Sequence, residues 1–201
     1  MKTEELKKRL LNGCREVIAA EAVLTDIDSR FGDADHGLTM TKIAHAMIRG
    51  IEEYTGSVKG LMSAAAEAVG AENGGSAVPL WTSWLEGMAD ACPDSEEISL
   101  DELKEMFAAG FEEFEFMSGA AVGDKTIMDA LAPATEAAQA AGDEDVLFTN
   151  AAEAAAHGAE STKNFTARYG RAKSYGEKTI GTPDAGALSM SCFFRGMADR
   201  D

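Results

Sequence analysis

Apolar residues recur every three or four positions along most of the chain, and this spacing predicts helices. The first stripe, from Leu6 to Val17, predicts a helix that Thr3 caps and that has acidic residues in its first turn. Seven further stripes predict helices that follow Leu38 and cover 57–69, 80–88, 99–114, 126–141, 148–165 and 187–197. Alternating β-branched residues do not occur in runs, so no sheet is expected. The pattern therefore predicts an all-α protein.

Two features refine this prediction. Ser99 and Glu102 have the spacing of a capping box and mark the start of a helix. The aromatic residues Trp81 and Trp84, and the phenylalanine-rich run 107–116, are interpreted as core.

The segments between the predicted helices are rich in glycine and in polar residues. They cover 24–37, 70–79, 118–126 and 167–186. The last one is too long for an ordinary helix connection, and loops of that length are often functional. Any chemistry is therefore expected in these four segments.

Composition limits the class of protein. A chain of 201 residues fits one domain, 1–201, and its 35 acidic and 18 basic residues give a net charge of −17. This charge argues against nucleic acid and anionic membranes as partners. The charged start of the chain and the absence of a long apolar run predict a cytoplasmic protein without a signal peptide or membrane span. A small phosphate-bearing ligand would need metal ions, helix N-termini or local basic residues.

The densest cluster of candidate ligands lies in segment 26–36, which contains Asp26, Asp28, Asp33, Asp35 and His36. Crowded carboxylates repel one another, and their oxygen atoms suit Mg²⁺ or Ca²⁺. The spacing is not that of an EF-hand. The alternative is a solvated acidic turn in which Asp35 caps the next helix.

The three histidines give less information about the kind of site. His36 either orients a phosphate or makes one backbone hydrogen bond at a helix start. His45 and His157 are interpreted as structural or surface residues, because they lie in predicted helices away from the acidic cluster.

Two other segments favour an anionic ligand. Gly70, Gly74 and Gly75 precede a helix, where glycines let backbone N–H groups approach an anion. The alternative is a simple turn capped by Ser76 or by Pro79, which has the same pattern. This is not a Walker A loop. Segment 168–173 is a basic island that suits a polyphosphate, with simple balance of surface charge as the alternative.

Taken together and in this order, the four segments resemble the nucleotide-binding domain of dihydroxyacetone kinases, which is called DhaL when it is a separate subunit. The matching blocks are Gly32 to Gly37 with Asp28 upstream, Gly74-Gly75 with Pro79-Leu80, and Gly123 to Thr126 with Asp129 and Pro133. The fourth block consists of Arg168, Gly170 to Ala172, Gly176-Glu177, Ile180-Gly181, Asp184 and Gly186-Ala187.

The resemblance implies a closed barrel of about eight antiparallel helices with the nucleotide site at one end. It implies that Asp28, Asp33 and Asp35 bind two Mg²⁺ ions and that these residues and Arg168 are catalytic. The implied contacts to the nucleotide are His36, Thr39, Gly74, Gly75, Ser76, Ala77, Gly123, Met128, Arg168, Asp184 and Gly186.

The function implied is that of the ADP- or ATP-binding subunit of a kinase for dihydroxyacetone or a related short ketose. A separate DhaK-like subunit would hold the ketose, and the phosphoryl donor would be ATP or a phosphotransferase-system protein that rephosphorylates bound ADP. Two alternatives remain open. A regulatory module is one, because Ser76-Ala77-Val78 departs from the family's usual glycine loop, and a metal-dependent phosphohydrolase is the other.

Overall fold

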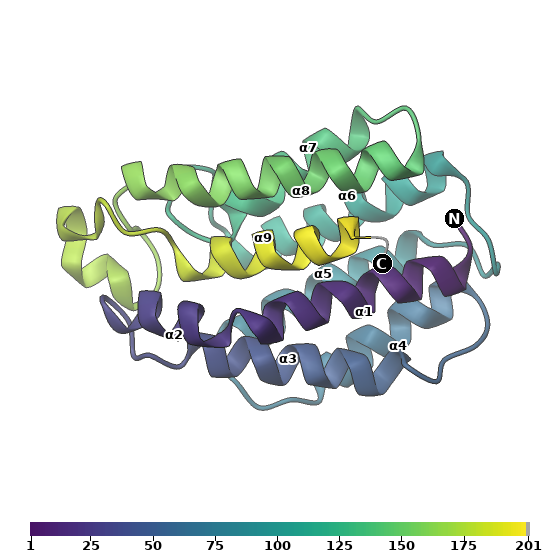
Figure 1. The fold of residues 1–201 in the computed structure, drawn as a ribbon, viewed down its shortest axis with the longest axis horizontal. Helices are drawn as coiled ribbons and strands as arrows, with labels where there is room; N and C mark the ends of the chain where they lie inside the picture. The colour runs from purple at the N-terminus through teal and green to yellow at the C-terminus, as the bar shows by residue number, and fades with distance from the viewer. Residues whose placement is uncertain (200–201) are drawn as a thin grey trace.

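The computed structural model describes residues 1–199, most of which lie in α-helices (Figure 1). These residues form nine α-helices and two 3₁₀ helices, and their only β-type pairing is an isolated bridge between Lys2 and Glu97. The α-helices are α1 (Thr3–Ala19), α2 (Glu21–Ser29), α3 (His36–Ile51), α4 (Val58–Gly70), α5 (Ala77–Ala91), α6 (Leu100–Ser118), α7 (Met128–Gln139), α8 (Glu144–Ser161) and α9 (Ala185–Ala198). The 3₁₀ helices are η1 (Thr162–Asn164) and η2 (Arg171–Thr179).

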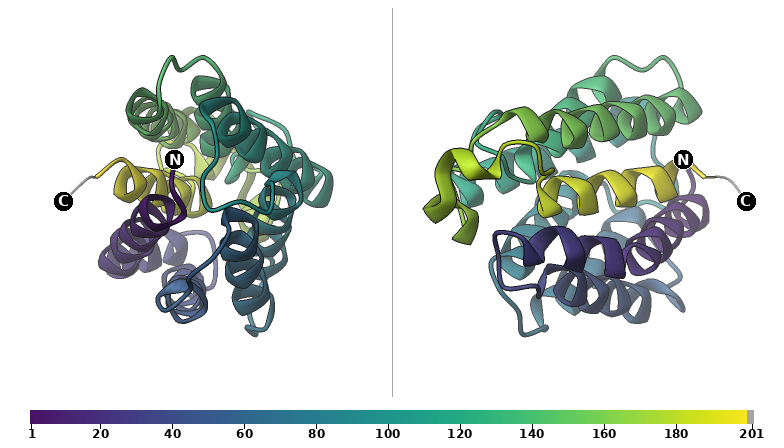
Figure 2. Two further views of the ribbon diagram at one scale, coloured as in Figure 1. Left: turned by 90° about the vertical axis from the view of Figure 1, so that its right-hand side faces the viewer. Right: turned by 60° about the vertical axis from the view of Figure 1, so that its left-hand side comes forward.

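Eight of the α-helices form a closed ring. Helix α1 packs on α3, each helix from α3 to α8 packs on the next one along the chain, and α9 packs on both α8 and α1. Figure 2 (left) shows this ring nearly end-on. Chain direction alternates between neighbours, so the predicted all-α barrel of about eight antiparallel helices is confirmed.

Helix α2 is the main departure from the predicted elements. Segment 24–37 was expected to be a break, but its first part continues the direction of α1 after a bend at Ala20 (Figure 1). The side chain of Leu24 is fully buried and anchors this extension. The loop before α3 therefore covers only 30–35 and contains Asp33 and Asp35, whereas Asp26 and Asp28 lie in α2.

Several helix ends also differ from the prediction. Thr3 does not cap α1, because its hydroxyl donates to the carbonyl of Glu96. Helix α8 begins earlier than expected, since the Asp143 carboxylate accepts from the N–H of Val146 at 2.8 Å. It ends at Ser161, where η1 replaces the last predicted turn. The predicted capping box is present.

Aromatic side chains fill the inside of the barrel. Trp81 and Trp84 of α5 pack edge-to-face on Phe193 of α9, with ring centroids 5.1 and 5.8 Å apart. Both tryptophans are buried as predicted, whereas Phe116 is 86% exposed and is not core. Phe116 lies in the last turns of α6, beyond the packed centre of the barrel. Helices long and apolar enough to cross a membrane are absent from residues 1–199.

Candidate functional site

The four segments between predicted helices converge at one end of the barrel. There they line a cavity of about 590 Å³. In Figure 2 (right) the chain segments of this end come forward on the left. The lining comes from the α2–α3 turn, the start of α5, the α6–α7 loop and the segment that leads into α9. The sequence places these segments up to about 150 residues apart, and the ring brings them together.

Ten of the predicted site residues line this cavity. They are Asp28, Asp33, Asp35, His36, Thr39, Gly75, Ser76, Ala77, Asp184 and Gly186. Four others, Gly74, Gly123, Met128 and Arg168, do not line it. Chain neighbours of three of them do, since Gly75, Ile127 and Tyr169 contribute to the wall.

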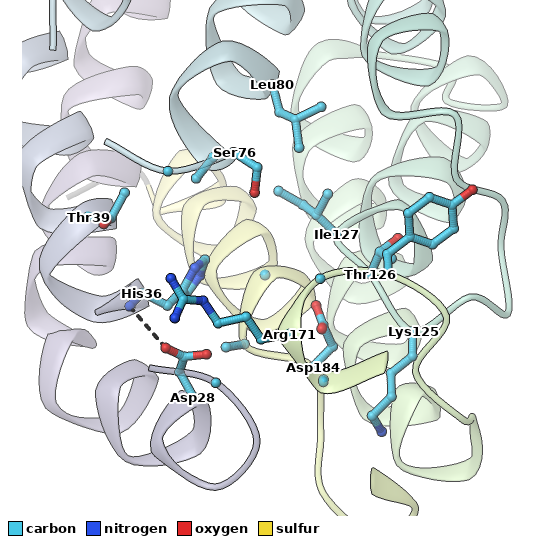
Figure 3. A pocket seen from close by; sticks show the side chains of 18 of the residues that line it. Asp28, His36, Thr39, Ser76, Leu80, Lys125, Thr126, Ile127, Arg171 and Asp184 are labelled. Atoms are coloured by element: carbon cyan, nitrogen blue, oxygen red, sulfur yellow. Dashed lines mark hydrogen bonds between the residues drawn. The ribbon is translucent and has the colours of Figure 1, made fainter. Parts of the chain in front are cut away.

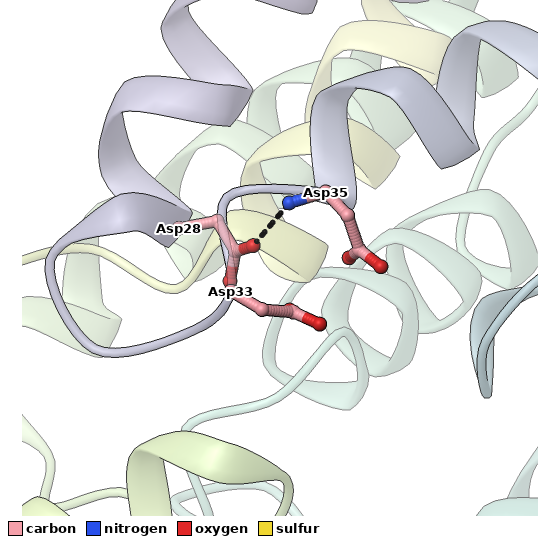
Figure 4. Close-up of side chains that lie close together, drawn as sticks. All are labelled: Asp28, Asp33 and Asp35. Atoms are coloured by element: carbon pink, nitrogen blue, oxygen red, sulfur yellow. Dashed lines mark hydrogen bonds between the residues drawn. The ribbon is translucent and has the colours of Figure 1, made fainter.

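Three carboxylates gather at the acidic side of the cavity (Figure 4). Asp28, Asp33 and Asp35 each offer an oxygen atom, and these oxygens lie within 4.8 Å of one another. Partial desolvation raises the pKa of Asp35, and the negative charge of Asp33 raises it further. Mutual repulsion of this kind is relieved by a bound cation, and carboxylate oxygens are the ligands that Mg²⁺ prefers.

Asp28 also shapes the turn that holds the cluster. Its Oδ2 atom accepts from the backbone N–H groups of Asp35 at 3.1 Å and His36 at 3.3 Å (Figures 3 and 4). Asp28 therefore bonds the free N–H groups at the N-terminus of α3, whereas the Asp35 side chain makes no capping hydrogen bond. A Cβ atom on Gly32 would lie 1.9 Å from Asp28 Oδ1, so a side chain there would displace the Asp28 carboxylate.

His36 connects the start of α3 to α9. Its Nε2 atom lies 3.1 Å from the hydroxyl of Ser189 on α9, and burial lowers its pKa. The ring is therefore held in place beside the cavity in its neutral form. His45 and His157 are exposed on helices, in agreement with their interpretation as surface residues.

The glycine loop reaches the cavity through Gly75, Ser76 and Ala77. Gly74 is needed for a close approach, since a Cβ atom there would lie 2.6 Å from Val78 Cγ2. Val78 is buried in the first turn of α5, and its backbone is not left-handed. The Ser76 side chain does not cap α5.

A third wall is the α6–α7 loop, which Asp129 organises. The Asp129 carboxylate accepts from the N–H groups of Gly123 at 2.5 Å and Thr126 at 2.7 Å. Gly123 thus supports the loop from behind, while Thr126 and Ile127 face the cavity (Figure 3).

The basic island contributes a different arginine from the one predicted. Arg171 lines the cavity (Figure 3), and its guanidinium lies 2.6 Å from an Asp33 carboxylate oxygen. Arg168 instead pairs with Asp124 at 3.2 Å and lines a neighbouring surface hollow together with Lys173. The sequence signal for Arg171 was the same basic island, in which spacing alone does not distinguish the two side chains.

Asp184 closes the floor of the cavity. Its carboxylate accepts from the N–H of Ala187 at 2.8 Å and caps α9. Burial raises its pKa to about 6, and the charge of Asp129 acts in the same direction. Lys125, which also lines part of the cavity, has its pKa lowered by burial.

The cavity therefore has two chemically different sides. One carries the three carboxylates with Arg171, which suits a divalent cation and the phosphates that it would bridge. The other presents Leu80, Met117 and Ile127, which suit a flat apolar group such as a base. This combination fits a metal–nucleotide complex.

Comparison with known proteins agrees with this class of site. The model of the DAK2 domain family matches residues 30–199, and the chain belongs to this family. Its relatives include the ADP-binding subunit DhaL of the PEP-dependent dihydroxyacetone kinase of Escherichia coli, with 30% identity over 186 residues, or 90% of this chain and 89% of that subunit. The L-erythrulose 1-kinase of Mycolicibacterium smegmatis is 32% identical over 89% of this chain, but the chain spans only about a third (32%) of that enzyme.

Solved structures show the same fold. The dihydroxyacetone kinase of C. freundii superimposes with a TM-score of 0.73 at 22% identity, covering 98% of this chain and 34% of that enzyme. A second structure of that kinase, determined in complex with AMP-PNP and Mg²⁺, gives a TM-score of 0.72.

Proposed function

We propose that this chain is the nucleotide-binding subunit of a kinase for dihydroxyacetone or a related short ketose such as erythrulose. The observation that carries the proposal is the cavity in which three carboxylates face Arg171 beside an apolar wall. The match to E. coli DhaL covers nearly the full length of both sequences, and it supports the nucleotide-binding role.

In this proposal Asp28, Asp33 and Asp35 hold Mg²⁺, and the number of ions inferred from the family resemblance is two. Bound Mg²⁺ would neutralise the phosphate charge that builds up during phosphoryl transfer. Asp28 orients the turn through its bonds to the α3 N-terminus, which prearranges the cluster. The predicted contacts of the remaining site residues to ADP or ATP belong to the same proposal, with Arg171 added beside the phosphates.

A ketose-binding partner subunit, similar to DhaK, completes the proposal. Apolar side chains near the cavity mouth support it, because Phe116, Met117 and Val122 are 86%, 52% and 60% exposed. Exposed apolar clusters of this kind favour protein association. Such a partner would also keep water away from the phosphoryl group. The proposed location is the cytoplasm, where kinases of this type meet their nucleotide.

Two routes supply the phosphoryl group. ATP exchanges at each turnover, or tightly held ADP is rephosphorylated in place by a phosphotransferase-system protein. Identifying the nucleotide released from the denatured protein, and then measuring exchange of labelled ATP with Mg²⁺, distinguishes them. Retained ADP that barely exchanges supports the second route, and rapid MgATP exchange supports the first.

The same experiment tests the alternatives. A protein that takes up neither nucleotide would contradict the proposal and favour a regulatory module of the same fold. Steady release of phosphate from MgATP without any partner would favour a phosphohydrolase.

A further inference from the structure

Lys125 combines two unusual features. Its backbone is left-handed, with φ at +60°, a conformation that residues with a Cβ atom rarely adopt. Its side chain is only 4% exposed, although a lysine ammonium is normally solvated. A strained backbone and a buried charge persist only where the surrounding structure holds them in place.

The ammonium group is held by two backbone carbonyls. Lys125 Nζ donates to the carbonyl oxygens of Thr162 and Thr182, each at 2.6 Å. Lys125 itself lines part of the cavity, but in Figure 3 its side chain extends away from Thr126 and Ile127. The lysine therefore does not face the acidic cluster and does not act there as a phosphate ligand.

These two carbonyls belong to different parts of the fold. Thr162 follows α8, is fully buried, and its hydroxyl accepts from the N–H of Asp184 at 2.8 Å. Thr182 lies at the start of the segment 182–186, which lines the cavity. Lys125 itself precedes Thr126 and Ile127, which line the adjoining wall. One ammonium group thus joins two walls of the cavity to the end of a barrel helix.

We propose that Lys125 is a positioning residue for the nucleotide, because its ammonium fixes the 126–127 wall against the 182–186 wall. The proposal rests on the proposed nucleotide binding. It assigns the left-handed backbone a purpose, since this conformation sends the side chain away from the next two residues, which face the cavity.

Two substitutions separate positioning from general stability. Lys125→Met removes the ammonium and keeps the strained backbone. Lys125→Gly removes the ammonium and also relieves the strain, because glycine adopts positive φ without a steric penalty. Lys163→Met is the matched control, since Lys163 lies beside Thr162 but its side chain is exposed and pairs with Glu160.

The measurements are urea unfolding, calorimetric titration with MgADP, and amide hydrogen exchange of residues 182–188. Lys125→Gly should unfold at a higher urea concentration than Lys125→Met. Both should nevertheless bind MgADP at least roughly tenfold more weakly, a factor typical of losing hydrogen bonds from a charged donor. Exchange at 182–188 should be faster in both, and Lys163→Met should resemble the wild type.

An affinity loss that follows the order of stabilities, or unchanged affinity in both variants, would overturn the proposal. Wild-type protein that binds no MgADP would instead overturn the proposed function. The exchange data would then still decide whether Lys125 holds the two walls together.

Discussion

The substitution Asp184→Asn should stabilise the ligand-free protein at neutral pH. Asp184 caps α9 from a half-buried position in the cavity wall, and desolvation raises its pKa from 3.8 to about 6. A carboxyl with its pKa raised by that amount costs about 3 kcal/mol of folding free energy when it is ionised. The asparagine oxygen still accepts from the N–H of Ala187, so the cap is retained while the desolvated charge is removed.

The sign of this effect depends on pH. Because the pKa is higher in the folded chain than in the unfolded one, the protonated carboxyl favours folding below about pH 4. That contribution is lost as the pH rises through about 6. Wild type and Asp184→Asn should therefore have similar stability near pH 4, and the variant should be more stable by up to about 3 kcal/mol near pH 7.5.

Urea unfolding in the presence of EDTA, repeated between pH 4 and 8, measures this difference. Asp143→Asn is the matched control, because Asp143 caps α8 in the same way from an exposed position. It should change stability by less than about 1 kcal/mol. A difference between wild type and Asp184→Asn that does not vary with pH, or a variant less stable at pH 7.5, would refute the reasoning.

Three further predictions concern packing, metal and phosphate. In urea unfolding, Gly158→Ala should destabilise the protein by about 1–3 kcal/mol or more, because its Cβ atom would lie 1.9 Å from the carbonyl oxygen of Asp129. Gly142→Ala is the control and should change urea unfolding little, because a Cβ atom there meets open space. Asp33→Ala should keep the helical circular dichroism of the wild type and lose Mg²⁺-dependent ADP binding in calorimetry; unchanged affinity would contradict the metal assignment. Arg171→Gln should change the free energy of unfolding by less than about 0.5 kcal/mol, since the ion pair of Arg171 with Asp33 is largely exposed. The same variant should bind MgADP roughly tenfold more weakly, and equal affinity would remove Arg171 from the site.

Much of the site could be predicted from the sequence because its residues are close together in the chain. Asp28, Asp33 and Asp35 fall within eight consecutive residues at the end of α2 and in the following turn, so the chain keeps their oxygen atoms close together. Glycine and polar residues interrupt the helical stripes at four places, and a ring of antiparallel helices with short connections brings alternate connections to the same end.

Other features of the fold and the site depend on contacts between residues far apart in the chain. The choice between Arg168 and Arg171 is made by the path of segment 167–186, which is anchored by distant groups such as the Asp124 carbonyl, the acceptor from the Arg168 N–H. The burial of Lys125 likewise requires carbonyls 37 and 57 residues further along the chain. Helix α2 was missed because polar and acidic residues obscure the single buried position at Leu24.

Calorimetric titration of the nucleotide-stripped protein with ADP, in Mg²⁺ and in EDTA, measures whether metal ions bridge the nucleotide to the three carboxylates. The arrangement of Asp28, Asp33 and Asp35 predicts tight binding with Mg²⁺ and a loss of most of that affinity in EDTA, because the carboxylates then repel the phosphates. Equal affinity in both buffers would contradict a metal-bridged nucleotide. Absence of binding in both would contradict nucleotide binding by this cavity altogether.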